Sequence, residues 1–205
     1  IGVLHTSANR VGALEAGFVP GKGGLNTSEI IEGTKNKKIK LLWLLGYDEE
    51  IIEKDSSAFI IYQGHHGDFG AESADLILPG SAYTEKNGTY INTEGRVQRT
   101  YAAVPPPGNA KEDWKIIRAF SEYIDKTLPY NNISQLRSHL ENINKNFVIE
   151  NSLLKAETTD IGDIKVKLKN TSIKPLKMNY FMTCPISRSS ETMAKCSIAK
   201  SKLGM

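Results

Sequence analysis

Residues 74–99 read ADLILPGSAYTEKNGTYINTEGRVQR, and this stretch decides how the rest of the chain is interpreted. Its first part, 75–79, is a short apolar run that stops at Pro79 and Gly80. Proline and glycine are the strongest local breaks in a regular element, so the pattern predicts a buried strand that ends in a turn. A short run that is apolar along its whole length is typical of a parallel sheet with both faces covered.

The second part of the stretch predicts two tight turns. Asn87-Gly88 lies between β-forming residues, and Asn-Gly is the strongest short signal for a type I′ hairpin turn, because both central residues need a positive φ. Another turn is predicted at 93–96, where Gly95 is free to adopt a backbone conformation that other residues avoid. On these local grounds the segment is a hairpin, and its glycines serve folding rather than chemistry.

The residues before this stretch follow a pattern of strand, helix and strand. Apolar runs at 40–46 and 58–62 predict two buried strands, and 47–54 between them predicts a short helix. A helical turn at 71–74 then leads into the apolar run at 75–79. Apolar strands joined in this way predict an α/β fold, with a parallel sheet and helices on both of its faces.

Two helices are predicted before the first strand. One covers 6–16 and ends in the Gly/Pro-rich loop 17–24. The next covers 28–37, with Asn26 or Thr27 as its N-cap, because asparagine and threonine side chains accept hydrogen bonds from the first free N–H groups of a helix.

Two more helices are predicted after the central stretch. Residues 101–104 are expected to end a strand, and the proline run at 105–108 to form a stiff connector. A helix at 111–126, capped by Asn109, follows. Its apolar face is expected to pack in the core and carries Trp114, Ile117, Phe120 and Ile124.

The second of these helices follows Pro129 and has Asn131 or Asn132 as its N-cap. His139 lies off its apolar face and is expected to be solvated. The residues expected to point inward are Leu136, Leu140 and Ile143.

Beyond residue 147 the pattern weakens, so we expect an α/β domain at 1–147 and an irregular C-terminal extension at 148–205. Within the extension, 164–169 alternates apolar and charged residues, which predicts an edge strand with one wet face. Residues 179–183 are expected to be extended, and a final helix is predicted at 187–200.

The composition argues against several classes of protein. The 205 residues are 40% hydrophobic and 24% charged, which is ordinary for a globular protein. A net charge of +3 is too small to argue for nucleic-acid binding. No apolar run approaches the roughly 20 residues that a membrane helix needs.

Two further expectations concern the redox state of the cysteines and the processing of the chain. Cys184 and Cys196 cannot build a disulfide framework, so we expect free thiols in a reducing compartment. The sequence shows no signal peptide and does not begin with Met, so we expect it to be processed or to be part of a longer chain.

Two glycine-containing segments fall short of nucleotide-binding motifs. Residues 17–23, GFVPGKG, approach a phosphate-binding loop, but the spacing is one residue short and Gly23 stands where Ser or Thr should hold magnesium. Gly46, after the first apolar run, lacks the Gly-x-Gly-x-x-Gly turn of dinucleotide sites. We therefore expect no nucleotide site in either place.

The segment GHHGD at 64–68 follows the predicted strand 58–62, at the end where open α/β sheets bind ligands. His65, His66 and Asp68 are of metal-binding types, but adjacent side chains diverge and no further ligand stands at a recognisable spacing. We expect a hydrogen-bonded loop instead. The sequence therefore predicts no catalytic, cofactor-binding or metal-binding residue on this chain.

The central stretch is similar to the late segment of the molybdopterin oxidoreductase fold. In that family a strand ending in Leu-Pro-Gly leads into the pattern Glu-x-x-Gly-Thr followed by Asn-Thr-Glu-Gly-Arg-x-Gln. The matching residues here are Glu85, Gly88, Thr89, Asn92, Thr93, Glu94, Gly95, Arg96 and Gln98.

Further segments resemble one branch of that family, the large iron–sulfur subunit of respiratory NADH:quinone oxidoreductase (complex I) of the mitochondrial and alphaproteobacterial type. They are YQGHHGD at 62–68, KEDWKIIR at 111–118 and ISRSSETMAKC at 186–196, together with VGAL at 11–14 and GFVPG at 17–21. The resemblance covers most of 1–147 and again 180–196, and it implies that the chain is the C-terminal portion of a molybdopterin oxidoreductase-like domain.

The resemblance also implies a role. In the family the iron–sulfur ligands lie in an N-terminal ferredoxin-like half, and the second half is not known to use a molybdenum cofactor in complex I. The chain would then be a structural part of the peripheral arm without a cofactor of its own. Iron–sulfur clusters and FMN would lie on partner chains.

The implied partners are a separate chain that carries the iron–sulfur half and other peripheral-arm subunits, without nucleic acid or a membrane span. The implied location is the matrix side of the mitochondrial inner membrane, or the cytoplasmic face of a bacterial inner membrane. Two other functions stay open. One is a fragment of a true molybdopterin-dependent oxidoreductase such as formate dehydrogenase, which the segments 62–68 and 112–117 disfavour. The other is a free-standing α/β binding module.

Overall fold

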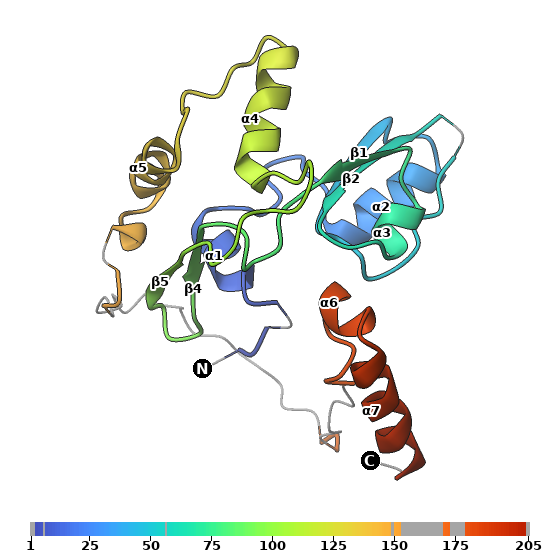
Figure 1. The fold of residues 1–205 in the computed structure, drawn as a ribbon. Helices are drawn as coiled ribbons and strands as arrows, with labels where there is room; N and C mark the ends of the chain where they lie inside the picture. The colour runs from blue at the N-terminus through green and yellow to red at the C-terminus, as the bar shows by residue number, and fades with distance from the viewer. Residues whose placement is uncertain are drawn as a thin grey trace. The chain divides into compact units, whose positions relative to one another are not determined.

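The structure is a computed structural model that describes residues 3–5, 7–55, 57–148, 150–152, 170–172 and 179–203. The chain divides into two compact units, residues 1–153 and residues 154–205, and each is described by itself. Figure 1 shows the helices and strands of both.

The centre of the first unit is a three-stranded parallel sheet in the order β1-β2-β3 (Figure 1). Its strands are β1 (Leu41–Leu45), β2 (Phe59–Gly64) and β3 (Leu76–Pro79). These bounds confirm that the three predicted strands form, and the parallel pairing confirms the predicted α/β class. The predicted burial of the first strand is wrong at its ends, because Leu41 and Leu45 are 53% and 51% exposed at the open edge of the described sheet.

Helices cover both faces of this sheet. On one face, Ile31 of α2 (Thr27–Lys35) and Ala71 of α3 (Phe69–Glu72) pack on a buried cluster of Leu44, Ile52, Ile60 and Tyr62. On the other face, Phe120 of α4 (Asp113–Tyr123) meets Trp43 edge to face, with the ring centroids 4.7 Å apart. Because neighbouring residues of a strand point to opposite faces, Trp43 packs on the face covered by α4 and Leu44 on the face covered by α2 and α3.

A second layer is built on an antiparallel pair, β4 (Gly88–Ile91) and β5 (Val97–Thr100). Val11 of α1 (Arg10–Glu15) and Leu140 of α5 (Ile133–Ile143) pack on its buried cluster of Ile91, Val97 and Phe147. The last of these belongs to the short 3₁₀ helix η1 (Lys145–Phe147). The Glu15 carboxylate accepts hydrogen bonds from Asn144 Nδ2 (2.7 Å) and Asn146 Nδ2 (3.0 Å), which fixes α1 against the end of this unit.

Capping side chains decide where the helices start. Asn26 Oδ1 accepts from Glu29 N (3.0 Å) while Glu29 Oε2 accepts from Asn26 N (2.8 Å), so Asn26 rather than Thr27 caps α2. Asn132, rather than Asn131, caps α5, with its Oδ1 accepting from Gln135 N (2.9 Å). The predicted cap at Asn109 is wrong, because α4 starts after Glu112.

The prediction of a type I′ turn at Asn87-Gly88 is wrong. Gly88 already belongs to β4, where it lies opposite Thr100, and it is not among the described residues with a positive φ. The hairpin turn lies at 92–96 instead, and there Gly95 has a φ of 86° as predicted. Tertiary contacts hold Asn87, because its backbone N and its Nδ2 both donate to Glu112 Oε1 at 3.2 Å.

Three other local predictions fail for tertiary reasons. Residues 47–54 are irregular rather than helical, because Ile52 is buried in the sheet core and its N–H donates to Ser73 Oγ (2.8 Å). The strand at 75–79 is formed but not buried, since β3 lies at the edge of the described sheet with Ile77 53% exposed. Ile143, expected to point inward from α5, is 66% exposed.

Several element ends also differ from the predictions. The helix expected at 6–16 is shortened to α1, the helix expected at 111–126 is shortened to α4, and the helical turn expected at 71–74 begins earlier as α3. The strand end expected at 101–104 is wrong because β5 ends at Thr100.

The second unit contains two described helices, α6 (Pro185–Arg188) and α7 (Glu191–Lys202). The single helix predicted at 187–200 is therefore interrupted, and Ser190 caps the second part by accepting from Met193 N. Residues 179–183 form a turn rather than an extended segment, with Met182 N donating to Asn179 O (3.1 Å). The edge strand predicted at 164–169 lies outside the described residues. No helix in the described ranges is long and apolar enough to cross a membrane.

Candidate functional site

The carboxyl end of the parallel sheet is a candidate site, because open α/β sheets bind ligands there. In this chain, backbone segments pair across that end. Gly80 N donates to Gly64 O (2.8 Å), which extends the pairing of β2 and β3. Ser81 N then donates to Lys111 O (2.9 Å), and Lys111 N donates to Pro79 O (3.1 Å). The segment before α4 therefore lies beside the end of β3, where Lys111 forms a single parallel bridge with Gly80.

Asp113, the first residue of α4, ties three segments together. Gln63, which is fully buried at the end of β2, donates from Nε2 to Asp113 Oδ1 (3.0 Å) and to Asp113 O (3.3 Å). The other carboxylate oxygen of Asp113 forms an ion pair with Lys86. Because one carboxylate serves both a buried amide and an ammonium group, it fixes the start of α4 against the end of β2.

Glu112, the residue before Asp113, also links the start of α4 to another segment of the chain. Its Oε1 accepts the two hydrogen bonds from Asn87, and its Oε2 accepts from Trp114 Nε1 (3.1 Å) and lies 2.9 Å from Lys115 Nζ. Burial alone would raise the pKa of the Glu112 carboxyl, but the hydrogen bonds from Lys115 and Asn87 outweigh it and hold that pKa below its ordinary value. Glu112 is therefore a structural anion and not a proton donor near neutral pH.

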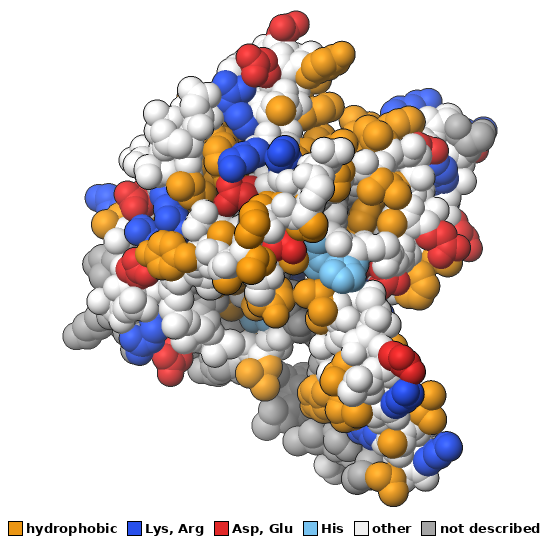
Figure 2. Space-filling model, in the orientation of Figure 1, with side chains coloured by type: hydrophobic (Ala, Val, Ile, Leu, Met, Phe, Trp, Pro, Cys, Tyr) orange, Lys and Arg blue, Asp and Glu red, His pale blue; other side chains and the backbone are white. Residues whose placement is uncertain are grey.

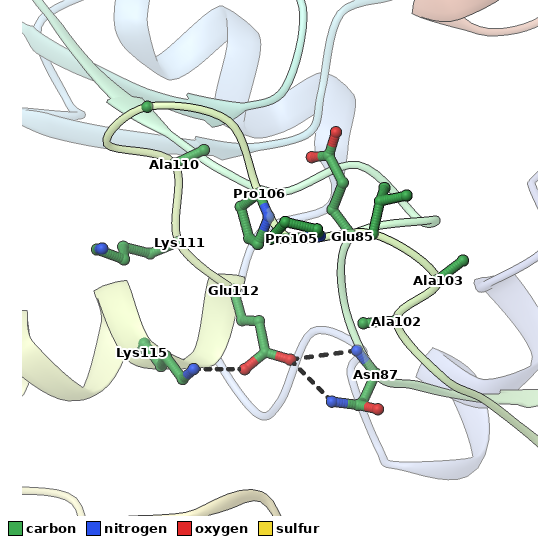
Figure 3. Close-up of a pocket in the computed structure, with 12 residues that line it drawn as sticks. Glu85, Asn87, Ala102, Ala103, Pro105, Pro106, Ala110, Lys111, Glu112 and Lys115 are labelled. Atoms are coloured by element: carbon green, nitrogen blue, oxygen red, sulfur yellow. Dashed lines mark hydrogen bonds and ion pairs between the residues drawn. The ribbon is translucent and has the colours of Figure 1, made fainter.

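We call the Gln63, Lys86, Asn87, Glu112 and Asp113 group the polar junction. Beside it lies a cleft of about 560 Å³, lined by Glu85, Glu112, Lys115 and the loop that contains Pro105 and Pro106 (Figure 3). Figure 3 shows the Glu112 carboxylate between Lys115 and Asn87, with both of its oxygens engaged. Glu85 is engaged as well, since its Oε2 accepts from Ala82 N (2.9 Å). The Glu85 and Glu112 carboxylates of the cleft are thus already engaged, and the Lys111 side chain also lines it.

The histidines of the predicted loop lie next to this junction. His65 Nδ1 and His66 Nδ1 are 2.7 Å apart, and Tyr62 Oη donates to His66 O (3.1 Å). Burial, and then the nearby His66 and Lys86 charges, lower the pKa of His65. Asp68 points elsewhere and caps α3 by accepting from Phe69 N (2.9 Å). No group of three or more His, Cys, Asp or Glu side chains in the described ranges is arranged to hold a metal ion.

The other candidate segments are also used structurally. The glycine loop at 17–23 leads to the N-terminus of α2, where the Glu29 carboxylate already occupies the position that an anion would need. In the second unit, Cys184 caps α6 by accepting from Ser187 N (3.4 Å), and the hydrogen bond from Ser187 lowers the pKa of its thiol. Cys196 lies on α7, and both thiols are free.

The Asn-Thr-Glu-Gly-Arg motif builds the hairpin turn. Asn92 Oδ1 accepts from Glu94 N (3.0 Å) and from Arg96 N (2.9 Å), and Gly95 N donates to Asn92 O (3.0 Å). Arg96 reaches out of the turn and donates to Asn151 O (2.8 Å). Asn92 thus organises the turn through its side chain, which is a common use of asparagine in loops.

Comparisons with known proteins agree with this architecture. The family model for molybdopterin oxidoreductase matches residues 1–123. The chain belongs to the molybdopterin oxidoreductase family. A second family model, which describes a C-terminal region of NADH-ubiquinone oxidoreductase, matches residues 148–196.

Several relatives of this chain are subunits of NADH oxidoreductases. The NADH-ubiquinone oxidoreductase 75 kDa subunit of Reclinomonas americana is 48% identical over 95% of this chain and 28% of its own length. The mitochondrial 78 kDa subunit of Candida albicans is 50% identical over 96% of this chain and 27% of its length. An NADH-quinone oxidoreductase subunit of Rickettsia typhi is 42% identical over 97% of this chain and 27% of its length. The chain thus spans about a quarter of the length of these relatives.

The family name implies a pterin cofactor with a phosphate tail, and the polar junction does not fit one. Phosphate needs free N–H groups or cations. Here Lys86 is paired with Asp113, Asn87 N is bonded to Glu112, and Ser81 N is bonded to Lys111. Two carboxylates stand at the start of α4, where they would repel an anion.

The sequence did not reveal the polar junction. Glu112 and Asp113 stand at the start of a predicted helix, where acidic residues are common because they favour the positive end of the helix dipole. Gln63 is a polar residue that ends an apolar run, which was the available signal for a buried amide. Neither signal indicated that these residues meet, because they are 50 positions apart.

Proposed function

We propose that the chain is a structural part of the peripheral arm of respiratory complex I, which supports the iron–sulfur half of the large subunit during electron transfer from NADH to ubiquinone. The observation that carries this proposal is the similarity to complex I subunits, at 42–50% identity over almost the whole chain. The chain contributes to an oxidoreductase as a subunit, with no catalytic, cofactor-binding or metal-binding residue of its own.

The polar junction supports a structural role. Its two carboxylates, its ammonium group and the Gln63 Nε2 donor are engaged with one another or with backbone, while the buried Gln63 Oε1 has no hydrogen-bond partner in the part of the chain that the structure describes. The bonds that are made hold β2, the segment before β4 and the start of α4 together. Iron–sulfur clusters and FMN then belong to partner chains.

The exposed apolar surface of the first unit supports a large partner. Leu41 is 53% exposed, Phe59 is 46% exposed and Leu76 is 42% exposed, although all three lie on strands of the sheet. Figure 2 shows hydrophobic side chains gathered over the region where Figure 1 places β1 and β2. Contiguous apolar surface of this kind marks a protein–protein contact. The partner that we propose is a separate chain with the iron–sulfur half of the large subunit, beside other peripheral-arm subunits.

The comparisons also support a proposed location and a proposed domain organisation. The mitochondrial and bacterial relatives support the matrix side of the mitochondrial inner membrane, or the equivalent cytoplasmic face in a bacterium. We also propose that residues 1–147 are the C-terminal part of the molybdopterin oxidoreductase-like domain and that 148–205 form its extension. The two family models, which match 1–123 and 148–196, support this division.

The test is purification of the chain through an affinity tag from its native membranes under mild detergent. We expect NADH:ubiquinone oxidoreductase activity and the complex I subunits to co-purify at constant stoichiometry. A chain that elutes alone on native sizing would favour the free-standing binding module and contradict the proposal.

The alternative of a true molybdopterin enzyme, such as a formate dehydrogenase, has its own test. Elemental analysis of the same purified assembly should find iron but no stoichiometric molybdenum or tungsten. One molybdenum or tungsten atom per chain would overturn the proposed function.

A further inference from the structure

The outer edges of the parallel sheet differ in how far the chain covers them. β3 is partly covered at its carboxyl end by the segment before α4, through the bridge between Gly80 and Lys111. β1 lies at the other edge and, within the described residues, pairs with β2 alone. The outer edge of β1 is therefore the longer open edge of this sheet.

The direction of the β1 backbone groups follows from two hydrogen bonds. Phe59 N donates to Lys40 O (2.9 Å), and Gly46 N donates to Gln63 O (2.8 Å). Along a parallel ladder, alternate residues direct both their N–H and their C=O to the same neighbour. Even-numbered residues of β1 therefore bond to β2. The N–H and C=O groups of Leu41, Trp43 and Leu45 point away from β2 to the outer edge.

The sequence of β1 lacks the features that protect a solvent-exposed edge. Natural edge strands carry lysine, proline, a bulge or an inward-pointing charge, which prevent pairing with another chain. β1 reads Leu-Leu-Trp-Leu-Leu, which contains none of them. A strand of this composition is typical of the interior of a parallel sheet.

Side chains on the face covered by α4 lead to the same conclusion. Strand alternation and register place Leu41, Leu45 and Phe59 on this face together with Trp43. Trp43 lies under Phe120, but Leu41 and Leu45 remain 53% and 51% exposed at the two ends of β1. The face is thus apolar along the full length of the open edge and is covered only near its middle.

We propose that a further parallel strand pairs with the outer edge of β1, and that this strand is supplied by the part of the family's polypeptide that lies outside the match with this chain. The inference rests on the proposed function, because it takes that polypeptide as the partner. About three quarters of each relative's length lies outside the match, which is ample for another strand and its helix. A second copy of this chain would pair β1 with β1 across a two-fold axis and therefore antiparallel, which an all-parallel sheet disfavours.

Hydrogen exchange in the purified complex tests the pairing directly. With single-amide resolution, the N–H groups of Leu41, Trp43 and Leu45 should exchange at least about 100-fold more slowly than unpaired loop amides. Leu42 and Leu44, which bond to β2, are the internal reference for a formed strand. If Leu42 and Leu44 are protected while the three outward amides exchange like loop amides, the inference is wrong, even though the chain is part of the complex.

A proline variant gives a second, independent test. Proline is tolerated on an edge strand when its position directs the N–H to solvent, and it is not tolerated where that N–H is paired. Leu45→Pro should therefore reduce assembled complex at least about tenfold relative to Leu45→Ala, which removes the side chain but keeps the N–H. Equal assembly of the two variants would mean that the edge is free. Two copies of this chain per complex, cross-linked through β1, would also overturn the inference in favour of self-pairing.

Discussion

The carboxyl end of the parallel sheet and the outer edge of β1 differ in how far residues of this chain pair with their backbone groups. At the carboxyl end, the Gln63 side chain donates to Asp113, and Glu112 accepts from the backbone N–H of Asn87. Other backbone N–H groups there, such as that of Gly80, donate to acceptors within the chain. At the β1 edge, Leu41 and Leu45 are half exposed and the outward backbone groups have no neighbouring strand in the described ranges. The chain thus engages many of its own polar groups at the end where α/β proteins bind ligands, whereas the β1 edge is the one for which we propose another polypeptide.

This difference is consistent with the structural role that we propose for this member of the molybdopterin oxidoreductase family. The fold is kept, because the buried core of Ile60 and Tyr62 still packs against helices. At the carboxyl end of the sheet, side chains hold backbone in place beside a cleft of about 560 Å³. The apolar edge of β1 is the surface at which we propose that a partner binds.

The largest expected effect is at the closed end. Glu112→Ala should destabilise the segment 85–88 and the start of α4 by about 2–4 kcal/mol, because it leaves the N–H groups of Asn87 and Trp114 without their acceptor. The measurement is the free energy of local opening, from hydrogen exchange in the assembled protein. Glu122→Ala, which removes an exposed partner of Arg118 on the same helix, is the matched control and should cost less than about 0.5 kcal/mol. Equal effects of the two variants would mean that the polar junction does not close this end.

A smaller effect is expected at the glycines of the hairpin. Gly95 has a φ of 86° and open space around it, so Gly95→Val should cost about 1–2 kcal/mol through backbone strain alone. Gly88→Val should also destabilise the hairpin, but through contact, because a Cβ there would lie 2.6 Å from Tyr90 Cε2 and 2.8 Å from Thr100 Oγ1. Gly21→Val, which meets neither constraint, is the control.

The functional outcome of these glycine variants distinguishes structure from chemistry. We expect electron transfer to fall only as far as the amount of assembled complex falls. The activity per assembled complex should therefore be unchanged. A Gly95→Val or Gly88→Val complex that assembles normally but transfers no electrons would show that the motif has a chemical role.

The smallest effect concerns pH at the closed end. Burial lowers the pKa of His65 below the ordinary value of about 6.5, so the folded state favours the neutral ring. The resulting stabilisation is fully present above that ordinary value and is lost as the pH falls through the lower folded-state pKa. The melting temperature of the assembled protein should therefore fall as the pH is lowered from about 7.5 to 5. The variant His65→Gln should show a smaller fall. His139→Gln, on the exposed side of α5, should retain the full loss, and a matching reduction there would contradict the assignment to His65.

Strong local patterns predicted much of the fold. The apolar runs at 40–46, 58–62 and 75–79 gave the three strands, because nothing in their surroundings competes with their pairing. The helix at 47–54 failed because Ile52 gains more from burial and from its hydrogen bond to Ser73 than from a helical turn. Asn87-Gly88 failed as a turn because Glu112, 25 residues away, holds Asn87.

The site was less predictable than the fold for the same reason. Its residues come from β2, from the segment before β4 and from the start of α4, so only the tertiary structure brings them together. Capping residues such as Asn26 were predictable because their partners lie three positions away. The sequence of β1 did not indicate that it lies at an edge of the described sheet, because Leu-Leu-Trp-Leu-Leu is typical of a strand in a sheet interior.

The most direct test of the central claim is to express the chain alone and together with the iron–sulfur half of the large subunit. We predict that the chain alone is insoluble or lacks a cooperative thermal transition, because its open apolar surface is then exposed to water. Co-expression should give a soluble pair that unfolds cooperatively. A soluble, monomeric chain with a cooperative melt and no partner would contradict the account.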